Sequence, residues 1–166
     1  MPTAYVFTAH GGPEVETFAD LPRPVPGPGQ VLVAVRAAGV NPVDWKLRAG
    51  FRLPGAPEPR FPVVFGGEVA GVVEQVGDDV TGVTAGDAVF GNPITGGYAQ
   101  YTLLPSELTA AKPAGLSFAD AATLPPPPTT ALSSSRCRLG RPCSSRGSAG
   151  ESASPRPRSP VTLDCG

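Results

Sequence analysis

Short apolar segments, which alternate with polar residues and end at glycine or proline, constrain this chain more than any other feature. The 166 residues include 21 glycines and 22 prolines, and many of these stand between the apolar segments. Side chains that alternate with a period of two indicate strands with one buried face. The candidate strands are Ala4–Phe7, Val31–Arg36, Glu68–Val76, Asp87–Phe90, Tyr98–Leu104 and Leu108–Ala111. The pattern predicts a mainly β fold, either a barrel or a sandwich.

Glycine and proline also mark two irregular places in this pattern. Gly71 interrupts the apolar run Glu68–Val76, where it would let the strand bend or form a bulge. The segment Leu21–Gln30 (LPRPVPGPGQ) is unsuited to the interior of a sheet, because its prolines lack the N–H that a ladder needs. We expect it to be a surface connector.

Two short helices are expected between the strands. Asn41 is a favourable N-cap and Gly50 suits the position after a helix end, so that Pro42–Ala49 is predicted to form two turns. A second helix is expected to begin at Ser117, which with the acidic residue three positions later forms a short version of the capping box. The proline run Pro125–Pro128 would end it.

The composition changes near Pro128. Residues 1–128 contain 7 Lys/Arg and 12 Asp/Glu, whereas residues 129–166 contain 6 Arg, two acidic residues, nine serines and all three cysteines. We therefore expect one domain over residues 1–128. We expect residues 129–166 to be a disordered, low-complexity Ser/Arg/Pro tail.

The composition also argues against several classes of function. The mildly acidic body offers no basic patch for nucleic acid, and residues 129–166 contain no aromatic side chains to stack on bases. No apolar stretch reaches the roughly 18 residues of a membrane span, and no N-terminal run resembles a signal peptide. The body has no cysteine, so that a cytoplasmic location is expected.

Four motifs follow one another in an order typical of one enzyme family. They are Asn41–Gly50 (NPVDWKLRAG), Phe61–Phe90 (FPVVFGGEVAGVVEQVGDDVTGVTAGDAVF), Gly96–Pro105 (GGYAQYTLLP) and Lys112–Pro125 (KPAGLSFADAATLP). Together they resemble the catalytic domain of the medium-chain dehydrogenase/reductase superfamily, on its zinc-free quinone oxidoreductase side. The resemblance covers roughly residues 3–132 and implies a GroES-like barrel with two short helices. It also implies NAD(P)H-dependent reduction of quinones or of activated C=C or C=O bonds by hydride transfer.

The resemblance also argues against zinc. Where the alcohol dehydrogenases of this superfamily have a cysteine and a histidine that bind catalytic zinc, this chain has Asn41 and Gly67. Glu68 is the remaining acidic residue of that motif, and one carboxylate does not make the three-ligand site that catalytic zinc needs.

Three residues are candidates for the site by resemblance alone. Asn41 would bind the cofactor's ribose, and Thr130 would approach the carboxamide, with Thr129 as the alternative. Lys46 would stabilise the enolate or hydroquinone oxygen that gains charge, or would contact the cofactor. NADPH is favoured over NADH by family habit. Taken alone, Lys46 is better explained as a solvated lysine.

The same region has purely structural explanations. Asn41 can act only as a helix cap, and Glu68 can orient the Asn41 loop instead of acting as an acid or a base. Asp44 and Arg48 lie four residues apart, which is the spacing of an ordinary ion pair on one helix face. Trp45 is expected to pack against the barrel.

The dinucleotide-binding (Rossmann) domain of such enzymes is not recognisable in residues 129–166. A glycine-rich turn at a helix N-terminus should follow, and Gly147–Ser152 (GSAGES) lacks its spacing. If the tail has G/C-rich codons and each is read from its third base, Cys143–Val161 can read LVxGVGGGVGVAAAQIAR. We therefore hypothesise a one-base frameshift near Ala131–Ser134. As written, the truncated chain is expected to have little or no activity.

A non-enzymatic function is the alternative, because GroES-like barrels also serve as interaction modules. Leu21–Gln30 or Phe51–Arg60 would then supply the surface for a partner. Such a module has no reason to keep Asn41, Lys46 and Thr130 in enzyme-like positions, and this distinguishes the two hypotheses.

Overall fold

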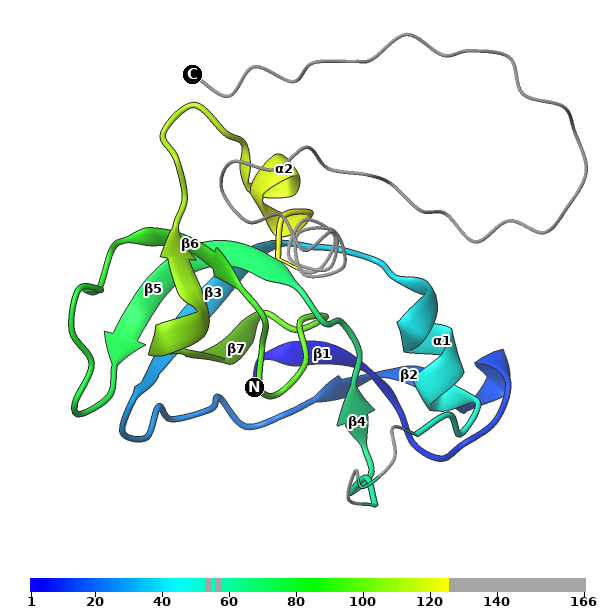
Figure 1. The fold of residues 1–166 in the computed structure, drawn as a ribbon. Helices are drawn as coiled ribbons and strands as arrows, with labels where there is room; N and C mark the ends of the chain where they lie inside the picture. The colour runs from blue at the N-terminus through cyan, green and yellow to red at the C-terminus, as the bar shows by residue number, and fades with distance from the viewer. Residues whose placement is uncertain (53–54, 56–57, 126–166) are drawn as a thin grey trace, which may run out of the picture.

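The fold is mainly β, as the alternating segments predict, in a computed structural model that describes residues 1–52, 55 and 58–125 (Figure 1). The strands are β1 (Thr3–Phe7), β2 (Glu16–Asp20), β3 (Gln30–Ala38), β4 (Val63–Val64), β5 (Val69–Val76), β6 (Ala88–Gly91), β7 (Tyr101–Pro105) and β8 (Thr109–Ala111). The helices are α1 (Pro42–Arg48) and α2 (Phe118–Ala122), with single 3₁₀ turns at η1 (Pro13–Val15) and η2 (Ser106–Leu108). Within the described ranges, neither α-helix has the roughly 20 residues needed to cross a bilayer.

The strands form two antiparallel sheets, where a GroES-like barrel is expected. The smaller sheet has the order β2-β1-β4, and the larger has the order β7-β3-β5-β6-β8. An isolated bridge between Ala4 and Ala99 joins the smaller sheet to the segment before β7. In Figure 1, β3 and β5 run along the middle of the curved larger sheet, and α1 lies to one side of both sheets.

The main hydrophobic core lies on one face of the larger sheet. It consists of the buried residues Val31, Val33, Val69, Val73, Val89 and Leu104. Alternate residues of β3 and β5 supply most of it, which is the period-two pattern visible in the sequence. Fully burying each such side chain is worth about 1.5–3 kcal/mol, so that this cluster is a major source of the domain's stability.

Helix α2 covers the opposite face of the larger sheet (Figure 1). Its Ala121 and Ala122 are buried against Ala70 of β5, where small side chains let the helix approach the strand closely. The Ser117 hydroxyl accepts a hydrogen bond from the Asp120 backbone N–H at 3.1 Å. The predicted N-cap is thereby confirmed, although the helix ends after five residues, before the proline run.

Gly71 lies at a close approach of two strands, and the bulge expected in its own strand at this place lies in the neighbouring strand instead. The register of β3 and β5 shifts between Val35 and Ala37, so that the bulged residue belongs to β3 and faces the glycine region of β5. A Cβ atom on Gly71 would lie well under 3.0 Å from the backbone carbonyl oxygen of Ala34. The glycine is required because the neighbouring atom is backbone, which has little freedom to move.

Two strands were not apparent from alternation, and one predicted strand begins late. β2 and β4 form by pairing with β1, and β2 leaves Phe18 exposed, so that the sequence shows no alternating apolar face there. The predicted strand Tyr98–Leu104 begins only at Tyr101. Tyr98 instead bonds through its backbone to Tyr5 and Phe65, which ties this segment to the smaller sheet.

Candidate active site

Helix α1 follows β3 and begins where the sequence predicts. Asn41 is the N-cap with extended backbone, Pro42 occupies the first helical position, and Gly50 has a φ of 96° just past the end. A left-handed φ is a conformation that glycine adopts without strain, so that Gly50 stops the helix. The N-cap places Asn41 beside the start of β5.

The Asn41 side chain is held by Glu68. Its Nδ2 donates a hydrogen bond to Glu68 Oε1 at 2.5 Å, and Glu68 is 3% exposed. The other carboxylate oxygen, Oε2, is buried and has no hydrogen-bond partner among the described residues. This geometry favours the interpretation that Glu68 orients the Asn41 loop over the interpretation that it is an acid or a base.

Gly39 makes room for this contact. A Cβ atom there would lie well under 3.0 Å from Oε1 of Glu68 and close to the rest of its carboxylate. The close approach of the Gly39 backbone to Glu68 is therefore a condition for the hydrogen bond to Asn41.

Replacing Gly39 by alanine is expected to displace the Glu68 carboxylate and to lower the free energy of unfolding by about 1–2 kcal/mol. Urea unfolding measures the change. Gly67→Ala is the matched control, because a Cβ atom at Gly67 would meet no atom within 4 Å. Equal stability of the Gly39→Ala and Gly67→Ala proteins would contradict the packing described for Gly39.

Asp44 is the buried residue of α1, at 8% exposure. Its Oδ2 accepts from the Asn41 backbone N–H at 2.9 Å, and its Oδ1 accepts from the Gly66 backbone N–H at 3.3 Å. The predicted Asp44–Arg48 ion pair is therefore wrong. Asp44 points toward the barrel, where backbone donors compensate for burial of its charge.

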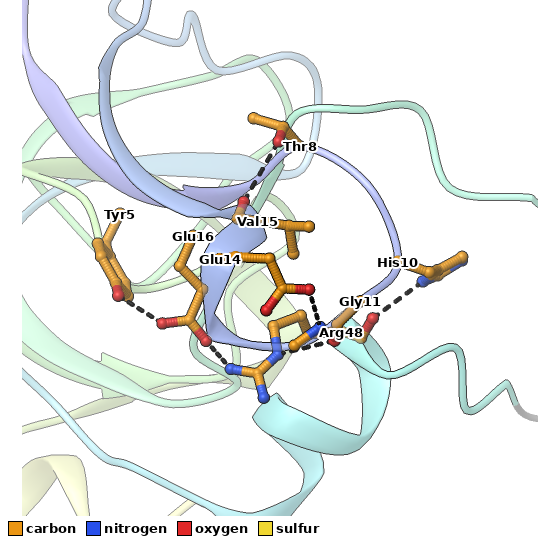
Figure 2. Close-up of polar contacts among 9 residues, drawn as sticks. Tyr5, Thr8, His10, Gly11, Glu14, Val15, Glu16 and Arg48 are labelled. Carbon is orange, nitrogen blue, oxygen red and sulfur yellow. Dashed lines mark hydrogen bonds and ion pairs between the residues drawn. The ribbon is translucent and has the colours of Figure 1, made fainter.

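Arg48 instead pairs with Glu16 of β2 (Figure 2). The second Glu16 carboxylate oxygen accepts from the Tyr5 hydroxyl, and the Arg48 Nε donates to the Gly11 carbonyl at 3.2 Å. His10 Nδ1 lies 3.3 Å from the Arg48 carbonyl oxygen. The cluster attaches the C-terminal end of α1 to the smaller sheet, and the sequence did not predict it because its members are far apart in the chain.

Tyr98 joins Asp44 from the segment before β7. Its hydroxyl lies 2.9 Å from Asp44 Oδ2 and 3.1 Å from the Gly39 carbonyl oxygen. Burial, the hydrogen bond to Asp44 and the nearby negative charges of Asp44 and Glu68 raise the pKa of Tyr98 above its ordinary value. Tyr98 was not among the residues predicted for the site. The motif GGYAQY was the available signal, and nothing in it indicates a contact with α1.

Lys46 lies on the exposed surface of α1 with its ammonium group 5.7 Å from the centre of the Trp45 ring. Trp45 is 54% exposed, and Val43 and Leu47 are 41% and 39% exposed. The prediction that Trp45 packs against the barrel is therefore wrong. The inward position of the helix is taken by Asp44, so that its large side chains face outward.

The structure thus brings Asn41 and Glu68 together and places Lys46 on the helix that Asn41 caps. Thr130 and its alternative Thr129 lie outside the described residues, as does the whole segment 129–166. Of the three residues proposed to bind the cofactor, the structure therefore describes two, Asn41 and Lys46.

The described residues do not make a zinc site. None of the three cysteines is among them, and His10 is next to Phe61 and Phe7, in a ring contact of 5.2 Å with the former. Over the part of the chain that the structure describes, no group of three or more His, Cys, Asp or Glu side chains is placed to hold a metal ion. Glu68 faces an amide, which does not supply the imidazole or thiolate ligands typical of catalytic zinc.

The barrel, its two helices and the α1 region define a known class of domain. Residues 27–114 match the alcohol dehydrogenase GroES-like domain, and the chain belongs to that family. This domain is the N-terminal domain of the medium-chain dehydrogenase/reductase superfamily, and the chain is a quinone oxidoreductase-like member of that superfamily. The expected fold class and family are thereby confirmed.

Similar proteins include the quinone oxidoreductase of Mus musculus, which is 39% identical over 136 residues, or 78% of this chain and 40% of that protein. An alcohol dehydrogenase superfamily protein from Novosphingobium aromaticivorans has a TM-score of 0.71 and 39% identity over 80% of this chain and 40% of its own. The Escherichia coli quinone oxidoreductase, solved with NADPH, has a TM-score of 0.66 and 32% identity over 74% of this chain and 36% of its own. This chain therefore spans about 40% of the length of the mouse relative.

Proposed function

We propose that this chain supplies the catalytic domain of an NAD(P)H-dependent oxidoreductase that reduces quinones or activated C=C and C=O bonds without zinc. The observation that carries the proposal is the Asn41–Glu68 pair. The Asn41 amide is held by the buried Glu68 carboxylate. By the family resemblance, Asn41 corresponds to a position where alcohol dehydrogenases of the superfamily have a zinc ligand. Quinone oxidoreductases are among the relatives that match the chain, which supports the same reaction class.

NADPH is the proposed cofactor, and when bound it would supply the hydride. The E. coli relative was solved with NADPH, which supports NADPH as a cofactor of such proteins. Another similar structure is that of an NAD-dependent alcohol dehydrogenase, so that the choice of NADPH over NADH rests on family habit. Asn41 would hold the ribose next to the nicotinamide, because its amide is oriented by Glu68 and retains a carbonyl oxygen that can accept from a hydroxyl. Thr130 is proposed for the carboxamide.

Lys46 is the proposed electrostatic partner of the substrate. When a quinone or an enone takes up hydride, negative charge develops on its oxygen, and a lysine ammonium stabilises that charge. The exposed position of Lys46 leaves its ammonium accessible beside the Trp45 ring. Without a metal ion as Lewis acid, this chemistry is limited to substrates that are already electron-poor.

A chimaera tests the proposed function directly. Residues 1–125 would replace the corresponding part of the E. coli relative, and NADPH oxidation would be followed with a quinone and with an enone. We expect reduction of at least one of them. Asn41→Ala should lower kcat/KM about tenfold, because it removes one hydrogen bond to the cofactor. Gln75→Ala, which removes an exposed amide elsewhere on the barrel, should leave the rate unchanged.

The same chimaera distinguishes the enzyme from the interaction module. A folded chimaera that binds NADPH and reduces neither substrate would contradict the proposed reaction and favour a partner-binding role for the barrel. If the Asn41→Ala chimaera keeps the kcat/KM of the chimaera that has Asn41, only the proposed role of Asn41 is contradicted.

A further inference from the structure

Helix α1 begins after its N-cap Asn41 and contains Lys46, yet little apolar packing holds it to the barrel. Asp44 is its buried residue, whereas Val43, Trp45 and Leu47 are all more than a third exposed. Burial of apolar surface therefore contributes little to the position of this helix. Its position depends on polar contacts at its two ends.

The contacts at the N-terminal end meet at the Asp44 carboxylate. They come from the backbone N–H of Asn41, the backbone N–H of Gly66 and the hydroxyl of Tyr98. The same hydroxyl lies 3.1 Å from the Gly39 carbonyl oxygen, and Asp44 Oδ2, at 2.9 Å, is the nearer of its two acceptors. Hydrogen bonds to an ionised acceptor are about twice as strong as those between neutral groups. One carboxylate thus links the start of the helix to the segment before β5 and to the segment before β7.

Tyr98 is itself fixed by the barrel. Its backbone N–H donates to the Phe65 carbonyl at 2.8 Å, and its carbonyl accepts from the Tyr5 N–H at 2.7 Å. Its ring lies against Gly66, where a Cβ atom would come well under 3.0 Å from the ring carbons. These contacts leave Tyr98 little freedom to move and hold its hydroxyl beside Asp44.

We propose that Tyr98 is a positioning residue of the candidate active site, which acts through Asp44 to set the place of Asn41. Asp44 holds the backbone of Asn41, while Glu68 holds its side chain. The Arg48–Glu16 pair holds the other end of the helix. The importance of this positioning for catalysis rests on the proposed function, whereas the positioning itself does not.

Hydrogen exchange of the complete 166-residue chain, measured by NMR, tests the proposal. Tyr98→Phe keeps the ring and removes the hydroxyl. We expect the backbone amides of Asn41 and Asp44 to exchange about tenfold faster, as expected from the loss of one hydrogen bond to a charged group. The amides of β3 and β5 should keep their protection. The Asn41 side-chain NH₂ signals, assigned with Asn41→Ala, should shift.

Tyr101→Phe is the matched control, because the Tyr101 ring lies under Arg23 and its strand pairs with β3 at Ala34. It should leave the Asn41 signals and exchange rates unchanged. Unchanged exchange at Asn41 in Tyr98→Phe would overturn the proposal. An equal loss of protection in β3 and β5, or failure of this variant to fold, would also overturn it, because Tyr98 would then support the whole domain.

Activity of the chimaera separates the two proposals. If Tyr98 acts through Asn41, Tyr98→Phe should lower kcat/KM, and combination with Asn41→Ala should lower it no further than Asn41→Ala alone. Fully additive losses would overturn the positioning role. If the exchange rates change as expected while the chimaera is inactive, the proposed function fails and the positioning of Asn41 stands.

Discussion

Replacing Gly71 by alanine is expected to destabilise the domain by about 3 kcal/mol, the upper part of the range for overpacked cores. A Cβ atom at this position would lie well under 3.0 Å from the Ala34 carbonyl oxygen and from a methyl group of Val33. Both neighbours belong to β3, whose pairing with β5 forms the centre of the larger sheet. Relief of the clash requires the two strands to separate, which costs packing among the core valines.

Urea unfolding followed by circular dichroism measures this change, as a lower midpoint with an unchanged slope. Gly115→Ala is the matched control, because a Cβ atom there would meet nothing within 4 Å and Gly115 lies in the loop before α2. The control should unfold within about 0.5 kcal/mol of the unmodified chain. A Gly71→Ala protein as stable as the control would show that the two strands are not packed as described.

Asp44→Asn is expected to have an effect of similar size, about 3 kcal/mol, which is typical when buried donors lose a charged acceptor. Every contact of the Asp44 carboxylate is with a donor: two backbone N–H groups and the Tyr98 hydroxyl. Asparagine replaces one acceptor oxygen by an NH₂ group, which would face a donor. The nearly isosteric change is therefore expected to be almost as damaging as Asp44→Ala.

Thermal and urea unfolding of Asp44→Asn, Asp44→Ala and Asp78→Asn provide the measurement. Asp78 is exposed, so that its conversion to the amide should change stability by less than about 0.5 kcal/mol. A stable Asp44→Asn protein, with Asp44→Ala strongly destabilised, would mean that the charge of Asp44 is not needed. The buried site would then require only a side chain of this shape.

Local patterns in the chain were sufficient for both helices and for most of the strands. Asn41, Pro42 and Gly50 predict the limits of α1 because caps and turns depend on the few residues around them. The role of Glu68 as a support for Asn41 was one of the alternatives that the motif allowed, and the hydrogen bond between them favours it. Neither inference needed knowledge of the sheet order.

The wrong predictions for α1 share one physical cause. Spacing along a helix shows which residues share a face, and it does not show which face meets the barrel. Asp44 and Arg48 have the spacing of an ion pair, yet Asp44 turns toward Tyr98 and Arg48 pairs with Glu16. Trp45 is exposed because Asp44, and not Trp45, occupies the face of the helix that meets the barrel.

By itself the sequence determined a mainly β domain and the positions of its two helices, and its motifs determined the resemblance to the GroES-like class. The role of Asn41 in the site stays a prediction from that resemblance. Those features depend on side-chain alternation, capping residues and motif order, all of which are local in the chain. The tertiary structure alone decided that Tyr98 and Gly66 meet Asp44, and that Gly39 lies against Glu68. These contacts join residues that are between 22 and 54 positions apart for Asp44, so that only the folding of the two sheets brings them together.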